Sequence, residues 1–146
     1  MRLYLDNCCL QRPLDDQTQP RIRVETEAVF AVLATVQGGE QTLLNSEALE
    51  YEVSRIPDEA RRREVFGVLA LASERLQLSE ISEALALALE QQGLSAMDAV
   101  HLALASIAKA DFFCTCDDRL FRKAKTISGL SCKVTTLLAL VPEVTK

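Results

Sequence analysis

The sequence lacks several features that would assign it to a common class of protein. No run of 18 or more apolar residues occurs, which argues against a membrane-spanning helix. The N-terminus has only a short apolar stretch and soon becomes acidic, unlike a secretory signal peptide. No repeat, low-complexity tract or linker divides the 146 residues. We therefore expect a single domain over residues 1–146, in the cytoplasm and without a membrane partner.

An excess of basic residues is also lacking. The chain has 16 Lys and Arg against 21 Asp and Glu, a formal net charge of −5. Proteins that bind nucleic acid nonspecifically are usually basic, because neutralisation of phosphates drives their affinity. The net charge is therefore mild evidence against nucleic-acid binding. This evidence is weaker if the acidic residues surround a bound cation, which changes the local sign of the charge.

The five cysteines lack the C-x-x-C spacing of a structural zinc site. They occur as Cys8 with Cys9, as Cys114 with Cys116, and as a lone Cys132. An odd number in a chain expected in the cytoplasm favours reduced thiols. We expect them to pack as small, partly buried side chains. For the first four, soft metal ligation or redox sensitivity is the alternative.

Hydrophobic patterning predicts strands that alternate with helices. A short apolar strand over residues 2–5 precedes a loop over 11–20, which contains two prolines. Apolar spacing and cap residues predict helices over about 22–37, 47–55, 58–72, 96–109 and 117–125, and from a cap at Ser79 to Gly93. Asn45 and Ser46 can cap the helix over 47–55. Further strands are predicted over 42–44, 76–78, 111–115 and 132–136, followed by an apolar turn at 137–140.

This alternation implies parallel strands joined by crossover helices. We therefore predict a three-layer α/β/α sandwich with a central parallel sheet. Ligands in such folds bind at the carboxyl ends of the strands. Asp6 directly follows the first strand, and Asp117 lies two residues beyond the strand that ends near Thr115.

Asp98 is expected at the same edge of the sheet. The helix over 96–109 joins the strand over 111–115 through a short turn, so the two run antiparallel. The helix is about 21 Å long, and the strand is about 17 Å long. The start of the helix therefore returns to the carboxyl end of the strand, which brings Asp98 near Asp117.

Clustered carboxylates repel one another, and a shared site raises the pKa of one of them. A divalent cation removes this penalty, and hard oxygen ligands suit Mg²⁺ or Mn²⁺. Such an ion can activate water and stabilise phosphate charge during in-line displacement. Phosphodiester hydrolysis is the reaction we expect from an all-carboxylate site without an obvious nucleophile.

Each acid taken alone has a structural explanation. Asp98 follows Ser95 in the S-x-x-D pattern of a capping box. Asp6 could form a turn or a cap, and Asp117 could cap the next helix. His101, one turn after Asp98, could orient substrate, but a lone histidine on an apolar helix more often forms a hydrogen bond within the core. The hypothesis rests on the convergence of the three aspartates.

Four segments of the chain resemble the PIN-domain family. They are L-Y-L-D-N at 3–7, S-x5-E at 46–52, A-M-D-A-V-H-L-A at 96–103 and F-C-T-C-D-D-R-L-F at 113–121. The resemblance implies an α/β/α sandwich, an acidic pocket with a divalent metal, and endoribonuclease activity on single-stranded RNA. Many small bacterial members are the VapC-like toxins of toxin–antitoxin pairs, which implies an antitoxin partner and a homodimer.

The resemblance also assigns site residues. Glu52 is chosen over Glu47 and Glu50 by its spacing from Ser46, although Glu47 is closer to the strand end that the sheet geometry favours. Thr115 matches the small hydroxyl residue before the last acid, and Asn7 matches the polar residue after the first; both are predicted to lie near substrate. The implied catalytic acids, which also serve as ligands of Mg²⁺ or Mn²⁺, are Asp6, Glu52, Asp98 and Asp117.

Two basic groups could contact RNA. Arg119, Arg122 and Lys123 share a helix face that begins beside Asp117, and they could hold the phosphates that flank a scissile bond. The run at residues 61–63, R-R-R, could grip RNA or an acidic partner. It could also form a solvated helix face, which is the commoner case.

Three other functions compete with the nuclease. A phosphoryl-transfer enzyme on a related sandwich would carry D-x-D after the first strand, whereas this chain has D-N-C at 6–8. Dinucleotide binding requires G-x-G-x-x-G after the first strand, and the sequence has none there. A PIN-like module that binds RNA or protein without catalysis would show metal affinity but no nuclease activity.

Overall fold

A computed structural model describes residues 1–145, so Lys146, the last residue of the predicted domain, lies outside the described residues. Its five strands form one parallel sheet in the order β3-β2-β1-β4-β5. The strands are β1 (Arg2–Leu5), β2 (Thr42–Ser46), β3 (Glu74–Leu76), β4 (Phe112–Cys114) and β5 (Lys133–Thr135). The predicted α/β class with a central parallel sheet is confirmed.

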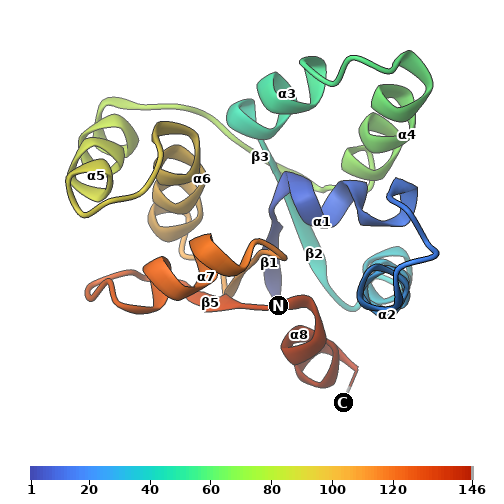
Figure 1. Cartoon of the computed structure of the whole chain (residues 1–146). Coiled ribbons are helices and arrows are strands. Elements are labelled where there is room, and N and C mark those ends of the chain that lie inside the picture. The colour runs from blue at the N-terminus through green and yellow to red at the C-terminus, as the bar shows by residue number, and fades with distance from the viewer. Residues whose placement is uncertain (146) are drawn as a thin grey trace.

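Helices cover the sheet on both sides. In Figure 1 the pair α5–α6 and the pair α2–α8 lie on opposite sides of the strands, and each pair packs closely together. The helices are α1 (Asn7–Gln11), α2 (Pro20–Gln37), α3 (Glu47–Ser54), α4 (Glu59–Leu69), α5 (Glu80–Gln91), α6 (Ala96–Ile107), α7 (Asp118–Lys125) and α8 (Leu137–Val144). Within residues 1–145, none of them combines the length and hydropathy needed to span a membrane.

Strand β1 lies at the centre of the sheet because it is apolar on both faces. Leu3, Tyr4 and Leu5 are completely buried. A strand buried on both faces needs a continuous apolar run rather than an alternating one. Asp6 follows this strand, and its backbone N–H donates to the carbonyl of Cys114 at 2.9 Å. The first acid is thus anchored at the carboxyl edge, in the middle of the sheet.

Serine side chains fix the starts of three helices, as predicted. Ser46 caps α3 by accepting the backbone N–H of Leu49 at 3.0 Å. Ser79 caps α5 and Ser95 caps α6 in the same way. These caps satisfy backbone donors that have no partner within the helix. They also fix where α3 and α6 begin, and these two helices carry Glu52 and Asp98.

Near the start of the chain, the structure differs from the prediction in two elements. The predicted loop over 11–20 contains the last residue of α1 and a short 3₁₀ helix, η1 (Arg12–Leu14). Helix α2 begins at Pro20, two residues before the predicted start. Proline suits the first helical position because its fixed φ matches the helix and it lacks only an N–H that would have no helical partner.

Later in the chain, the structure differs from the prediction in two further elements. The strand predicted over 76–78 lies at Glu74–Leu76, where it pairs with residues 44–46 of β2. The predicted apolar turn at 137–140 is the first half of α8. Its buried residues follow helical spacing at Leu137, Leu140 and Val144. The turn prediction was wrong because Pro142 lies inside the helix, where proline is usually a terminator.

Gly93, between α5 and α6, adopts a φ of +106°, which L residues rarely do. A Cβ there would also meet the end of the Lys123 side chain, which is flexible and can move aside, so the cost of a side chain comes from the backbone conformation. Gly93→Ala should therefore lower the free energy of unfolding by roughly 1–3 kcal/mol in urea denaturation. Gly67→Ala in α4, where a Cβ would meet no atom within 4 Å, is the matched control. It should stabilise by roughly 0.5–1 kcal/mol; equal effects of the two substitutions would contradict this account.

Candidate active site

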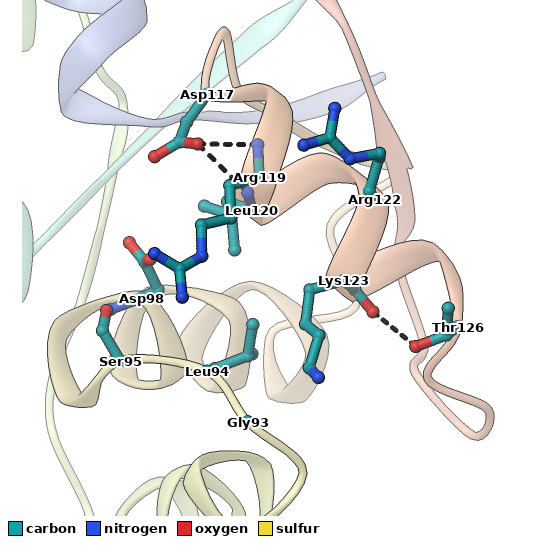
Figure 2. Close-up of a pocket in the computed structure, with 10 residues that line it drawn as sticks. All are labelled: Gly93, Leu94, Ser95, Asp98, Asp117, Arg119, Leu120, Arg122, Lys123 and Thr126. Carbon is teal, nitrogen blue, oxygen red and sulfur yellow. Dashed lines mark hydrogen bonds between the residues drawn. The ribbon is translucent and has the colours of Figure 1, made fainter.

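Acidic side chains meet at the carboxyl edge of the sheet. Carboxylate oxygens of Asp6 and Glu52 and a ring nitrogen of His101 lie within 4.8 Å of one another. Asp98 and Asp117 line a pocket of about 670 Å³ between α6 and α7 (Figure 2). The charges of Asp117 and Glu52 both act on Asp98, so the cluster and the pocket form one electrostatic site.

Asp6 is buried, and hydrogen bonds fix both of its carboxylate oxygens. Oδ1 accepts the backbone N–H of Asn7 at 2.8 Å, and Oδ2 accepts the hydroxyl of Thr115 at 2.9 Å. The thiol of Cys8 also lies 3.4 Å from Oδ2. Burial raises the pKa of Asp6 well above its usual range, and the neighbouring Cys8 and Glu52 raise it further. The carboxylate therefore sits where an uncompensated negative charge is unfavourable.

Thr115 links the first and last acids. Its hydroxyl is fully buried, donates to Asp6 and accepts the backbone N–H of Asp117 at 3.1 Å. Asp117 is the N-cap of α7, and its Oδ1 accepts the N–H groups of Arg119 and Leu120 at 2.9 and 3.1 Å. Its second oxygen points away from α7 (Figure 2). The contacts of Thr115 are thus with the acids themselves, and its predicted contact with substrate stays a prediction.

Asp98 combines a cap position with a place in the site. Its backbone N–H donates to Ser95 at 3.3 Å, so the capping interaction exists. Burial raises the pKa of Asp98, and the charges of Asp117 and Glu52 raise it further, against the opposing effects of Ser95 and His101. Capping and a place in the site are therefore compatible, because Asp98 interacts with Ser95 at the helix start while its carboxylate remains within reach of the charges of Asp117 and Glu52.

The three glutamates of α3 have different surroundings. Glu47 and Glu50 both pair with Arg75, at 3.9 and 2.8 Å. Glu52 instead faces the interior, with a carboxylate oxygen within 4.8 Å of an oxygen of Asp6. The position of Glu52 is thus the one consistent with a shared acidic site, although strand geometry alone favoured Glu47.

A buried series of hydrogen bonds ends at one of the acids, Glu52. The Tyr4 hydroxyl lies 2.7 Å from Oγ of Ser46 and 2.6 Å from Nδ1 of His101. Nε2 of His101 lies 2.9 Å from Oε1 of Glu52. Burial opposes protonation of His101, but the bond to Glu52 and the charge of Asp6 outweigh it and raise the pKa of the imidazole. The core hydrogen bond predicted for His101 is confirmed.

Tyr4 and Ser46 were not predicted as parts of the site. A tyrosine within an otherwise apolar buried strand was the available signal, because its hydroxyl requires a partner. Ser46 was predicted only as a helix cap and fills that role as well. This series of hydrogen bonds joins β1, α3 and α6 through side chains, and it orients Glu52 toward Asp6.

Arg119, Arg122 and Lys123 of α7 line the same pocket as Asp98 and Asp117. In Figure 2, Arg119 extends from α7 toward α6, whereas Lys123 runs toward the backbone at Gly93. Arg122 extends from another side of α7. Among the ion pairs of residues 1–145, none involves these three side chains. The predicted basic face is therefore available to an anionic ligand.

The second basic group, residues 61–63, makes contacts within the protein. Arg61 pairs with Asp15, and Arg62 donates to a backbone carbonyl at 2.7 Å. Arg63 pairs with Glu59 one turn earlier at 3.1 Å, a mostly exposed pair. These contacts fit the interpretation of residues 61–63 as part of the surface structure of α4 rather than as a free RNA grip.

The donor set fits a hard divalent cation. Across residues 1–145, no Lys or Arg forms an ion pair with Asp6, Asp98 or Asp117. Burial raises the pKa of both Asp6 and Asp98, and neighbouring acids raise it further, so their ionised forms lack a compensating positive charge. Carboxylate oxygens are the ligands preferred by Mg²⁺ and Mn²⁺. A cation of this class would remove the repulsion that the protein leaves in place.

Asp6→Asn is expected to stabilise the metal-free protein at neutral pH. A raised pKa means that the folded state binds the proton more tightly than the unfolded chain. Stability is therefore greatest below the ordinary Asp pKa of about 4 and falls as pH rises through the raised value. The neutral amide avoids this loss and still suits the cap of α1.

At pH 7 in EDTA, urea denaturation should show a gain of roughly 1–3 kcal/mol for Asp6→Asn, the range for a poorly compensated buried polar group. The gain should shrink near pH 4, where wild-type Asp6 is protonated. Asp118→Asn is the matched control, because this exposed carboxylate pairs with Arg21 and its pKa is lowered. No gain for Asp6→Asn at neutral pH would contradict the assigned cause.

Comparison with known proteins gives two findings. A family model for the PIN domain matches residues 20–126, a segment that includes Glu52, Asp98 and Asp117. The fold is similar to a chain in the crystal structure of VapBC2 from Rickettsia felis bound to a DNA fragment from their promoter. That match has a TM-score of 0.56 and 16% identity, and it covers 93% of this chain and 98% of that chain. A search of curated proteins found no significant match.

Proposed function

The chain belongs to the PIN-domain family, and from this membership we propose that it is a metal-dependent endoribonuclease that cleaves single-stranded RNA. The observation that carries the proposal is that Asp6 and Glu52 lie close together, while Asp98, which is within electrostatic reach of Glu52, lines with Asp117 a pocket that also has basic residues in its walls. The acids come from four separate parts of the fold, and within residues 1–145 no Lys or Arg forms an ion pair with the three aspartates. A divalent cation would neutralise the acidic residues, and a phosphodiester would pair with the basic residues of the pocket wall.

The four acids would hold one or two Mg²⁺ or Mn²⁺ ions. A bound ion of this class supplies an activated water and stabilises negative charge on phosphate oxygens. The protein supplies the alignment of the ligands. Thr115 fixes one oxygen of Asp6, and His101 fixes one oxygen of Glu52. Asn7 fixes the other oxygen of Asp6 through its backbone, and its buried side-chain oxygen has no hydrogen-bond partner among residues 1–145.

The basic residues of α7 would position the RNA. Arg119, Arg122 and Lys123 line the pocket that Asp98 and Asp117 also line, so phosphates held there lie beside the acids. Arginine binds phosphate oxygens through paired donors, and lysine does so as a point charge. This local basic surface explains how a chain with a net charge of −5 could bind RNA.

Removal of metal gives the direct test. Purified protein should cleave a labelled single-stranded RNA in Mg²⁺ or Mn²⁺, lose the activity in EDTA, and regain it when excess Mg²⁺ is added. Because water is the expected nucleophile rather than the 2′-hydroxyl, the products should lack 2′,3′-cyclic phosphate. Cleavage that persists in EDTA, or that yields cyclic phosphate, would contradict the proposal and would indicate a contaminating ribonuclease.

A toxin role and a protein partner are the next step of the proposal. The similar structure is a VapBC assembly, and the chain resembles VapC-like toxins. We therefore expect an antitoxin encoded by a short neighbouring reading frame, and a homodimer in sedimentation experiments. Co-expression with that reading frame should yield a complex with suppressed ribonuclease activity. Absence of any such neighbour would contradict the toxin role but leave the nuclease proposal intact.

A further inference from the structure

Three of the five cysteines converge beside Asp6. The sulfur atoms of Cys8, Cys9 and Cys116 lie within 4.8 Å of one another, and all three are free thiols. Cys8 and Cys9 belong to α1, whereas Cys116 lies between β4 and α7. We propose that these three residues, the thiol site, bind a thiophilic divalent cation of the Zn²⁺ class.

Backbone contacts hold the two segments of the thiol site together. The N–H of Cys116 donates to Sγ of Cys8 at 3.3 Å. Sγ of Cys9 donates to the carbonyl of Cys114 at 3.4 Å, and the N–H of Asp6 donates to the same carbonyl at 2.9 Å. The sulfur atoms are therefore brought together by the pairing of β1 with β4 before any ion binds.

The spacing suits tetrahedral coordination. Zinc–sulfur bonds of about 2.3 Å place two sulfur ligands about 3.8 Å apart, so the thiol site must contract by no more than about 1 Å. Rotation of the cysteine side chains provides a movement of this size. Water can supply the fourth ligand, since the group of mutually close ligand atoms contains the three sulfurs only; an oxygen of Asp6 lies beside it, 3.4 Å from Sγ of Cys8. Sulfur ligands select Zn²⁺ over Mg²⁺, which prefers oxygen.

The surroundings also suit a bound dication. Cys9 and Cys116 are buried, whereas Cys8 is partly exposed and provides the entrance. Arg12 interacts electrostatically with Cys116, so it offsets part of the excess negative charge of three thiolates around one dication. Cys132 is buried elsewhere and does not belong to the group. Simple packing of a small thiol explains Cys132. It does not require three sulfur atoms to lie within 4.8 Å of one another.

Cobalt absorption provides the test, because Co²⁺ bound by thiolates gives an intense near-ultraviolet charge-transfer band and Co²⁺ bound by carboxylates does not. Reduced, metal-free full-length protein should develop the band with one equivalent of Co²⁺. Zn²⁺ should bleach it, and excess Mg²⁺ should not. Cys8→Ser and Cys116→Ser should lose most of the band, whereas the matched control Cys132→Ser should keep it. Circular dichroism verifies that each variant folds.

A second measurement uses the unmodified protein. Zn²⁺ at about ten times its dissociation constant should slow alkylation of Cys8 about tenfold, as measured by mass spectrometry of the labelled peptides. Alkylation of Cys132 should be unaffected. No charge-transfer band with the folded wild type, a band that survives in both Cys8→Ser and Cys116→Ser, or no selective protection of Cys8 would each overturn the proposal.

Occupancy of the thiol site has a consequence that rests on the proposed nuclease. A dication bound to Cys8 competes for the carboxylate of Asp6 and repels a second dication there. Zn²⁺ should therefore inhibit RNA cleavage in Mg²⁺ more strongly in the wild type than in Cys116→Ser; equal inhibition would overturn this consequence. The cobalt spectrum is recorded without RNA, so failure of the thiol site and failure of the nuclease proposal are separate results.

Discussion

Asp98→Asn is expected to reduce metal-dependent RNA cleavage by at least about 100-fold without unfolding the protein. Changes in residues that only support metal ligands cost about 10–100-fold, so the loss of a ligand should match or exceed that range. The neutral amide carries no charge to balance a dication. Its backbone N–H still donates to Ser95, so the start of α6 is preserved. Initial rates on labelled RNA and calorimetric titration with Mn²⁺ would measure the two effects.

Asp118→Asn provides the matched control for this experiment. Asp118 follows the site residue Asp117, but it is exposed and pairs with Arg21 at 2.7 Å. The same chemical change there should leave cleavage near the wild-type rate. Wild-type activity in Asp98→Asn would remove Asp98 from the proposed site. An equal loss in both variants would indicate a general effect of negative charge rather than a specific ligand.

His101→Leu is expected to lower RNA cleavage about 10–100-fold, although His101 is fully buried and cannot touch RNA. The imidazole bridges Tyr4 and Glu52, at 2.6 and 2.9 Å. Leucine fills the space but makes neither hydrogen bond, so Glu52 loses the contact that aims it at Asp6. We therefore assign His101 as a positioning residue. Stability should also fall, by about 1–3 kcal/mol, because buried polar groups lose a partner.

Metal affinity separates positioning from a purely structural role. If His101 orients Glu52, the dissociation constant for Mn²⁺ should rise in His101→Leu, and His101→Gln should restore part of it because its amide can donate to the carboxylate. Tyr4→Phe keeps the contact between His101 and Glu52 and should affect cleavage less. Unchanged metal affinity and cleavage in a less stable His101→Leu protein would show that the bridge serves only the core.

The edge of the sheet where the acids meet could be predicted because strand ends are visible in the sequence. Asp6 directly follows an apolar run, and Asp117 lies two residues beyond a second predicted strand, which ends near Thr115. The roughly matching lengths of the predicted helix over 96–109 and the predicted strand over 111–115 then predicted that Asp98 would return to the same edge. These inferences depend only on element type and order, which hydrophobic periodicity reveals.

The side-chain contacts within the site could not be predicted. Thr115 and Asp6 are 109 positions apart, and Tyr4 and His101 are 97 apart. Whether such residues meet depends on register, here the pairing of Tyr4 with Phe113, which no local pattern determines. Sequence reasoning therefore singled out Thr115 and His101 but could not name the residues that they contact, and it missed Tyr4.

Two short helices were missed for local reasons. Helix α1 has only five residues, too few to show a period, and it begins at once because the Asp6 carboxylate accepts the N–H of Asn7. Helix α8 contains Pro142, which suggested a turn. The apolar spacing of α8 was present in the sequence, so this error came from giving proline more weight than the pattern of buried residues.

The central position of β1 makes the order of synthesis important. Residue 6 leaves the ribosome long before the strand beside it, β4, and the acid at 117. A nascent chain that stops short of this point can fold its first segments, yet it lacks one wall of the pocket. The proposed RNA cleavage would therefore have to wait until β4 and Asp117 have been synthesised.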